Sequence, residues 1–252
     1  MNRSFAQQKF LVWNMGCYLF CLLLLLPASW VKQHISLPAG LEIIGVEGTL
    51  WHGRIALLRW QNKTFRQVNW SVRWRSLLVG KIAAAIRIDD GDTLTGRAVV
   101  AYRQRWSVTG MEFQTSADWL VGHLPRTLPV VLTGRVRGEV RELTFTPQGC
   151  ITLNGHARWQ DGSIDSLWGQ LKLGGSDWIF SCDDQQARIA IEQAADSVSS
   201  RTTLLLSIQG QYHIQSLLTP GRGFPPPLAR LLKAGGQDMG NGIYNISASG
   251  RL

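Results

Sequence analysis

The sequence predicts a mainly β protein, in which an N-terminal transmembrane helix precedes an open, curved antiparallel β-sheet with one or two short helices. Three observations support this fold class. An uncharged apolar run lies near the N-terminus. The rest of the chain alternates apolar and polar residues with a period of two, which is typical of half-buried strands. Glycine-containing turn signals separate these alternating runs, and no long helical pattern interrupts them.

The apolar run occupies residues 10–31 and contains no charged residue. A run of about 20 apolar residues is long enough to cross the ~30 Å hydrocarbon core of a bilayer as a helix. Arg3 and Lys9 precede the run, and no acidic residue occurs before Glu42. Because positive flanks stay on the cytoplasmic side, the run predicts a cytoplasmic N-terminus and an exported remainder.

The chain therefore divides into a cytoplasmic segment at residues 1–9, a transmembrane helix at 10–31 and an exported β-rich domain at 32–252. A cleaved signal peptide is the alternative interpretation, because the Pro-Ala-Ser stretch at residues 27–29 resembles a cleavage region. The apolar run exceeds the core of about 7–15 residues in a typical signal peptide, and we favour the anchor. Both interpretations export residues 32–252.

Strict alternation is clearest at residues 68–74, where one face of a predicted strand holds Val68, Trp70, Val72 and Trp74. The pattern recurs at residues 82–88, 135–141 and 204–208. Hairpin signals lie between the runs, at Asp90-Gly91, Gln148-Gly149, Asn154-Gly155, Asp161-Gly162 and Asn241-Gly242. Strands that recur about every 8–12 residues favour an antiparallel meander over a sheet with crossover helices.

Two short helices are expected within the β region. The first covers residues 116–123, where Ser116 is a capping residue and Pro125 follows the end. The second covers residues 227–234, after a run of prolines and before Gly235. A sheet with one apolar face must curl on itself, pack against these helices or leave an apolar groove, and the sequence does not choose among the three.

Ionisable residues in the sequence form no recognisable catalytic or metal site. The five histidines are far apart and have no zinc-ligand spacing: His34, His52, His123, His156 and His213. No nucleophile elbow, phosphate-binding loop or dinucleotide-binding glycine pattern occurs. We therefore predict no enzyme activity, no catalytic residues, no cofactor and no metal. An envelope hydrolase whose Ser, His and Asp come together from distant segments is kept as a minor hypothesis.

The formal net charge is +9, which in principle suits nucleic acid, anionic lipid or an acidic partner. The basic residues are scattered along the predicted strands and do not cluster. This pattern favours a solvated basic face, and we predict no nucleic-acid binding.

The four cysteines form two sequence pairs. Cys17 and Cys21 lie inside the apolar run, where cysteine usually packs as a small apolar residue. Cys150 and Cys182 lie beside turn residues in the β region and are the better candidates for a disulfide in an oxidising compartment. Two buried free thiols are the alternative.

Three stretches of the sequence resemble a known family. Residues 46–54 read VEGTLWHGR and contain Gly48, Thr49, Leu50, Trp51 and Gly53. Residues 68–78 read VNWSVRWRSLL and contain Trp70 and Trp74, and residues 242–252 read GIYNISASGRL. Their order, the N-terminal apolar run, the total length and the pair Cys150 and Cys182 resemble the type II secretion system protein N family.

The resemblance implies a single-pass inner-membrane protein with a cytoplasmic N-terminus and a periplasmic β domain. It implies a non-catalytic component of the machine that moves folded exoproteins from the periplasm across the outer membrane. The implied partners are other inner-membrane and periplasmic secretion proteins, with membrane lipid around the anchor.

The shared motif has a structural interpretation that is independent of the family. Gly48 permits a turn, Leu50 and Trp51 supply core area, and Gly53 starts the returning strand. A docking surface for a partner is the alternative interpretation. The G-T-L-W phrase is also similar to segments of AsmA-like envelope proteins, which implies a second possible function: a periplasmic groove that binds or transfers lipid.

Overall fold

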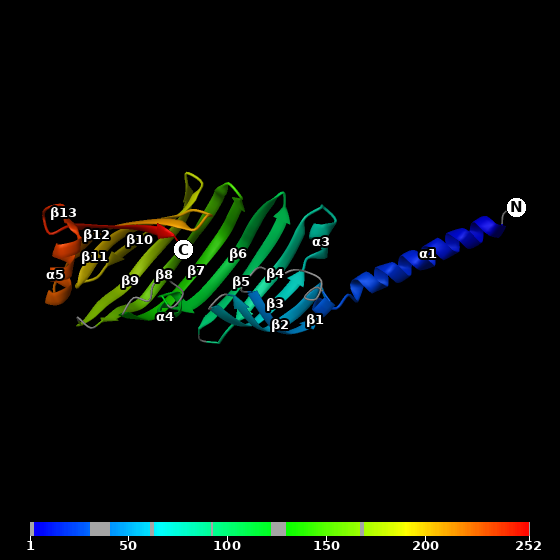
Figure 1. Cartoon of the computed structure of the whole chain (residues 1–252), viewed down its shortest axis with the longest axis horizontal. Helices are drawn as coiled ribbons and strands as arrows, with labels where there is room; N and C mark the ends of the chain where they lie inside the picture. The colour runs from blue at the N-terminus through cyan, green and yellow to red at the C-terminus, as the bar shows by residue number, and fades with distance from the viewer. Residues whose placement is uncertain are drawn as a thin grey trace.

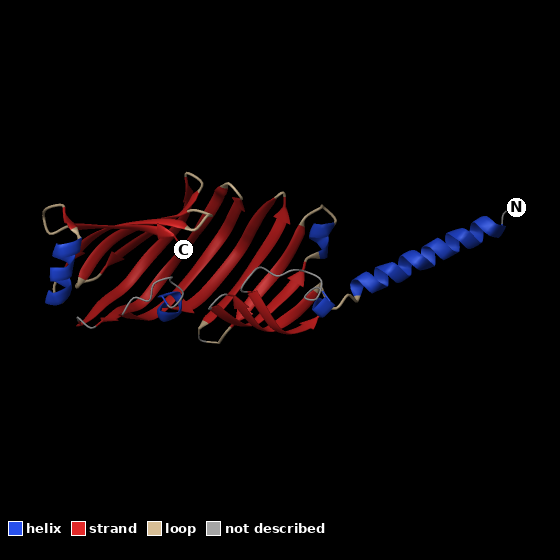
Figure 2. Ribbon diagram, in the orientation of Figure 1, coloured by secondary structure: helices blue, strands red, loops and turns tan. Residues whose placement is uncertain are grey.

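The protein is one long, twisted antiparallel sheet with a separate N-terminal helix, as the computed structural model in Figures 1 and 2 shows. The structure describes residues 3–30, 41–60, 63–91, 93–121, 130–166 and 169–251. In this part of the chain, 14 strands pair in sequence order, except that β14 lies between β12 and β13. The predicted antiparallel meander is therefore confirmed.

The strands of the first half are β1 (Leu41–Gly48), β2 (His52–Trp60), β3 (Lys63–Val72), β4 (Ile82–Asp89), β5 (Leu94–Arg103), β6 (Arg105–Ser116) and β7 (Val130–Thr146). Those of the second half are β8 (Gly149–Ser166), β9 (Gly169–Asp183), β10 (Gln186–Ala194), β11 (Val198–Leu206), β12 (Gln211–Pro220), β13 (Gln237–Asp238) and β14 (Tyr244–Arg251). The helices are α1 (Arg3–Leu24), α3 (Trp74–Leu77), α4 (Ala117–Val121) and α5 (Pro226–Gly235).

The prediction of a transmembrane helix at residues 10–31 is wrong. Within the described ranges, no helix combines the length and the apolar character that crossing a membrane requires. α1 begins in the polar segment 3–9 and ends at Leu24. Residues 10–24 rise only about 22 Å in a helix, which is short of a ~30 Å hydrocarbon core. Beyond the helix, Pro27 forms an isolated antiparallel bridge with Thr49, and Val31 lies outside the described residues.

Both predicted short helices are present. α4 covers residues 117–121 of the predicted segment 116–123, whose last two residues lie outside the described residues. Its first turn is capped because the Trp119 backbone N–H donates to Ser116 Oγ at 3.3 Å. α5 corresponds to residues 227–234 and has proline in its first turn. α3 was not predicted: β3 ends at Val72, so Trp74 belongs to one helical turn and does not share the strand face of Val68, Trp70 and Val72.

Three of the five predicted hairpin turns connect strands, and two lie inside a strand. Asn154-Gly155 and Asp161-Gly162 are both part of β8, which runs for 18 residues. Asp161 has a φ of 54°, and the pairing of β8 with β9 shifts between Trp159 and Gly162. A β-bulge uses the same residue types as a turn, because both need a positive φ. At Asp161-Gly162 the sequence signal therefore marked a bulge. Asn154 and Gly155 have no positive φ and lie opposite a register shift in β7.

The two faces of the sheet differ in chemistry. One face carries the main core, and α4 packs there. The core consists of Ala117, Val136, Ala157, Trp159, Leu171, Leu173 and Val198, with half-buried aromatic residues around it. The opposite face carries charged side chains of the central strands. The alternation seen in the sequence thus separates an apolar face from a charged face.

Aromatic side chains on the apolar face lie across glycines of neighbouring strands. Phe113 pairs with Gly138, and a Cβ atom added at Gly138 would lie 2.7 Å from the Phe113 ring and 2.6 Å from Ala157 Cβ. Trp70 covers Gly53 and Tyr212 covers Gly250 in the same way. The missing side chain lets the ring lie flat on the sheet, so each pair covers apolar surface without a second layer.

A disulfide joins Cys150 on β8 to Cys182 on β9, with their Cα atoms 5.8 Å apart. The two residues are 32 positions apart in the sequence. In the described part of the chain, Cys17 and Cys21 are free and exposed on α1. The bond therefore links two of the longest strands. It lies near the start of β8, where the Cys150 backbone N–H donates to the Gln185 carbonyl.

Replacing Gly138 with alanine is expected to lower the free energy of unfolding by about 1–3 kcal/mol, because the added methyl overlaps Phe113 and Ala157. Denaturant unfolding of the full chain measures the change. Gly235→Ala is the matched control, since a Cβ there meets no atom within 4 Å and alanine is favourable in a helix. Equal stability of the two variants would contradict the ring-on-glycine packing.

Removing the disulfide with Cys150→Ser and Cys182→Ser is expected to reduce stability by about 3–4 kcal/mol in the chain-entropy model, given a closed loop of about 33 residues. Unfolding under oxidising and reducing conditions checks this value, because the reductant should affect only the parent chain. A parent chain whose stability is unchanged by reductant would show that the bond contributes nothing.

Candidate interaction site

The shared sequence motif forms the joint between α1 and the sheet. The Leu50 backbone N–H donates to the Leu26 carbonyl at 2.9 Å, and Trp51 Nε1 donates to the Leu23 carbonyl at 2.8 Å. Together with the bridge between Pro27 and Thr49, these bonds satisfy carbonyl groups at and just beyond the C-terminal end of α1. The motif therefore fixes the end of the helix against the first hairpin.

Three tryptophans from separate segments meet at this joint. The rings of Trp51 and Trp74 lie with their centroids 4.0 Å apart and an interplanar angle of 33°. Trp70 Nε1 donates to the Leu50 carbonyl at 3.0 Å. Gly48 has a φ of 97°, which permits the turn. Gly53 has no side chain, which leaves room for the Trp70 ring.

The predicted motif residues Gly48, Thr49, Leu50, Trp51, Gly53, Trp70 and Trp74 thus come together in one place. They support the end of α1 as well as the sheet. From the sequence, only a role within the sheet was predicted. Trp74 is 43% exposed and Trp51 is half-buried. Docking of another protein on this joint stays a prediction.

A second candidate site is a shallow, open cavity of about 860 Å³ on the charged face. It crosses six strands, from β4 to β9. We call it the charged groove. Its ionisable side chains are Arg87, Asp89, Arg97, Glu112, Arg137, Glu139, His156, Arg158 and Asp177. Its four arginines balance its four carboxylates, so the groove presents both signs of charge over a short distance.

The strand register places like charges directly opposite each other in this groove. Arg87 pairs with Arg97, Glu112 with Glu139, and Arg137 with Arg158. Like charges on directly opposite residues destabilise a sheet, whereas a strict alternation of signs would stabilise it. The groove is therefore divided into small patches of one sign, an arrangement that the stability of the sheet does not explain.

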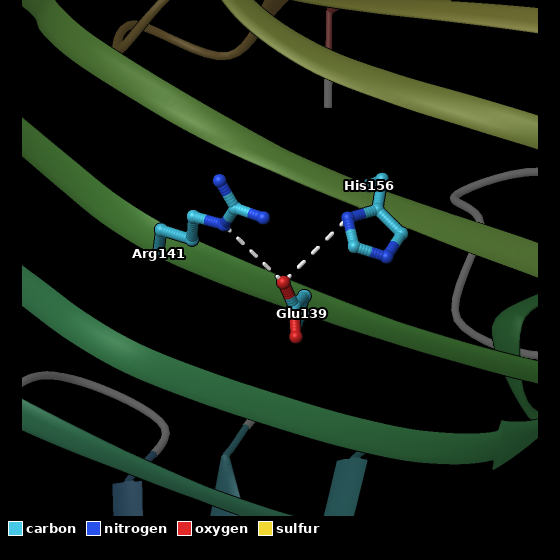
Figure 3. A network of polar contacts seen from close by, with 3 residues as sticks. All are labelled: Glu139, Arg141 and His156. Atoms are coloured by element: carbon cyan, nitrogen blue, oxygen red, sulfur yellow. Dashed lines mark hydrogen bonds and ion pairs between the residues drawn. The ribbon is translucent and has the colours of Figure 1, made fainter.

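Ion pairs between the patches are present but exposed. Arg97 Nη2 donates to Glu112 Oε1 at 2.6 Å, and this hydrogen bond together with the Glu112 charge raises the pKa of Arg97. Figure 3 shows Glu139 between Arg141, at 3.4 Å, and His156, at 3.8 Å. Each of these three side chains is more than 40% exposed, and exposed pairs contribute about 0–1 kcal/mol each.

Among the cations of the groove, Arg87 is the one most available to bind a partner. Within the described ranges, its guanidinium makes no ion pair or hydrogen bond, and its side chain is exposed. Arg137, by contrast, donates two hydrogen bonds to Gln114 Oε1, at 2.8 and 3.1 Å. A partner carboxylate would therefore meet Arg87 without displacing an internal contact.

This groove was not predicted from the sequence. The alternation at residues 135–141 shows that the charged residues share one face of a strand. It does not show which charges lie opposite each other, because that depends on the register between strands. A usable signal was the repeated arginine or glutamate on the polar face of several consecutive strands, which antiparallel pairing brings side by side.

The histidines do not form a cluster in the described chain. His52 Nδ1 lies 3.4 Å from Thr49 Oγ1, His156 lies beside Glu139, and His213 is exposed on β12. His34 and His123 lie outside the described residues. Among the residues that the structure places, no group of three or more potential metal ligands was found.

Matches to known proteins cover nearly the whole chain. The sequence model described as "Type II secretion system (T2SS), protein N" matches residues 39–247. The chain belongs to the type II secretion system protein N family. The match includes the motif, the charged groove and both disulfide cysteines, and it begins after α1. The family resemblance found in the sequence is confirmed.

Three relatives carry the name type II secretion system protein N. The protein from Vibrio cholerae is 30% identical over 237 residues, which cover 90% of this chain and 91% of the relative. The protein from Aeromonas hydrophila is 29% identical over 238 residues, covering 93% and 94% of the two chains. The protein from Pectobacterium carotovorum is 22% identical over 218 residues, covering 86% and 87%. No solved structure matches the chain.

For this member of the protein N family, Trp51→Ala is expected to loosen the joint, because it removes the ring contact with Trp74 and the bond to the Leu23 carbonyl. Hydrogen exchange at the Leu50 and Val72 amides should become faster. Trp51→Phe should have a smaller effect, since it keeps a ring and loses only the hydrogen bond.

The control for this prediction is Trp106→Ala, which removes an exposed tryptophan paired with Tyr102 far from the joint in sequence. Exchange at Leu50 should not change in this variant. If Trp51→Ala also leaves exchange at Leu50 unchanged, the motif does not hold the end of α1.

Proposed function

We propose that this chain is a non-catalytic component of the type II secretion system that works in the periplasm. It assists the export of folded proteins across the outer membrane through contacts with other secretion-system proteins. Membership of the family supports the role in secretion. The disulfide between Cys150 and Cys182 supports the compartment, because such bonds persist in the oxidising periplasm and are rare in the cytosol.

The observation that carries the proposed contact is the like-charge pairing in the charged groove. Patches of one sign that destabilise the free sheet become favourable when a partner places the opposite charge over them. Arg87 and Arg97 suit a partner carboxylate, whereas Glu112 and Glu139 suit a partner lysine or arginine. We infer that the partner is a protein with both signs of charge on a surface that fits an open groove.

The exposure of the groove fits protein contact better than chemistry. Catalytic groups usually lie in clefts that exclude water, where burial and charge partners alter their protonation. Here the paired side chains of Glu139, Arg141 and His156 remain in contact with solvent. The role that we assign to them is recognition at the rim of an interface. The lipid-binding alternative stays a prediction, and the groove described here is charged.

Reversing one charge tests this function. Arg87→Glu is expected to reduce both the recovery of other secretion-system proteins with this chain and the amount of exoprotein in the medium. The change places a carboxylate directly opposite Arg97 in place of a guanidinium, and it breaks no internal bond. Arg87→Lys should retain most of the activity, because it keeps the charge.

Arg105→Glu is the matched control, since Arg105 is also exposed and lies outside the groove. Normal secretion and normal recovery of partners with Arg87→Glu would remove the groove from the proposal. Defects of equal size with Arg105→Glu would show that the chain responds only to its total charge.

A further inference from the structure

The two edges of the sheet are protected to very different degrees. An unpaired edge strand invites pairing with another strand, and proteins usually block it with charges, bulges or covering segments. β1 has all three devices. Glu42 and Glu47 lie along it in ion pairs with Arg59 and Arg54, and Gly45, with a φ of 67°, interrupts the pairing with β2. Just beyond the end of the strand, Thr49 is covered by its bridge with Pro27.

β14 has almost none of these devices. Its pairing with β12 runs without a break from Tyr244 to Arg251. On the other side, in the described part of the chain, β13 pairs with Tyr244 and Asn245 alone. Residues 246–251 therefore form a free edge that contains no proline, lysine or acidic residue. Figure 1 shows β14 in red, running to the C-terminus.

The side chains of this free edge are small and nearly uncharged. Ser247, Ala248, Ser249 and Gly250 are all exposed, and Arg251 is the one charged residue among residues 246–251. Every second residue of such a strand directs its backbone N–H and C=O outward. A strand added here would gain a complete hydrogen-bond ladder without meeting a bulky or repelling side chain.

We propose that the occupant of this edge is β14 of a second copy of the chain, paired antiparallel around a two-fold axis. In such a pair, two residues that lie directly opposite each other point to the same face of the sheet. Residues of one strand that share a face are both odd-numbered or both even-numbered, so the numbers of two opposite residues add up to an even sum. β13 already occupies the positions opposite Tyr244 and Asn245, which excludes registers that use them. The register centred on Ser249 pairs residues 247–251 of the two copies and leaves only Ile246 of the free edge without a partner among the described residues.

This register brings no like charges together and places small side chains opposite each other. Ser249 lies opposite Ser249 of the partner, and Ala248 lies opposite the partner's Gly250. Arg251 lies opposite the partner's Ser247, so the two arginines do not face each other. β13 of each copy lies beyond the C-terminal end of the other β14 and does not obstruct the pairing. The proposal is independent of the charged groove, which lies on β4 to β9.

Cysteine crosslinking of the full chain tests the proposal. Ser249→Cys, in a Cys17→Ser and Cys21→Ser background, is expected to form a disulfide-linked dimer under mild oxidation, because the paired Cα atoms lie ~4.5–5.5 Å apart. Ser247→Cys alone should stay near the background level, whereas a mixture of Ser247→Cys and Arg251→Cys chains should crosslink. Ile44→Cys, on the β1 edge, is the control and should give no dimer.

Mass measurement of the unmodified chain gives a second readout. Light scattering should report twice the 28.1 kDa of one chain, and Ser249→Pro, which removes one backbone donor at the edge, should shift it to the mass of one chain. Retention of the Cys150–Cys182 bond in this variant shows that it still folds. A monomeric parent chain, equal crosslinking at Ile44 and Ser249, or a Ser249→Cys crosslink only to a different protein would each overturn the proposal.

Discussion

The rest of this structure depends on one continuous ladder of backbone hydrogen bonds. Each strand from β1 to β12 pairs with the strands next to it in sequence, so the chain has few long-range contacts other than the ladder. A single layer of this kind leaves one apolar face without a second sheet to cover it. The aromatic residues that lie across glycines, such as Phe113 over Gly138, let the sheet cover part of that face with its own side chains. The fold is therefore stabilised locally, strand by strand, and its surface is large for the number of residues.

The same ladder explains why the charged face is the more informative one for function. On the apolar face, packing determines most residue types, because ring, glycine and aliphatic side chain must fit together. On the opposite face, water tolerates many combinations, and stability favours opposite charges across strands. The pairs Arg87–Arg97, Glu112–Glu139 and Arg137–Arg158 depart from that preference. The pairs Arg97–Glu112 and Arg158–Asp177 follow it. A departure from the stable pattern at exposed positions is what a binding requirement produces, since the partner supplies the missing opposite charges.

Much of the fold followed from the sequence, and the failures have physical reasons. The alternation of Val68, Trp70 and Val72 predicted β3, and the capping Ser116 predicted α4, because both signals are local.

Trp74 continued the alternation by chance, and its ring stacks on Trp51 from a helical turn. Asp161 and Gly162 were expected at a turn, and the long strand β8 uses them as a bulge. The N-terminal run contains no charge over residues 10–31, but α1 ends at Leu24, and the residues after it form the joint with Thr49, Leu50 and Trp51. The charged groove needed the register of six strands, which no local pattern supplies.

The joint also changes how the family motif is understood. Leu50 and Trp51 bind carbonyl groups at the end of α1, and Trp70 binds the Leu50 carbonyl from within the sheet. The direction of α1 is therefore coupled to the first hairpin by hydrogen bonds and not only by the connecting chain. Bonds of this kind are directional, with the donor close to 2.8–3.0 Å from its acceptor, so they resist rotation of the helix more than apolar contact alone does. Since Pro27, just beyond α1, bridges Thr49 at the end of β1, pairing beyond that end is blocked, which leaves β14 as the more open side on which the sheet can be extended.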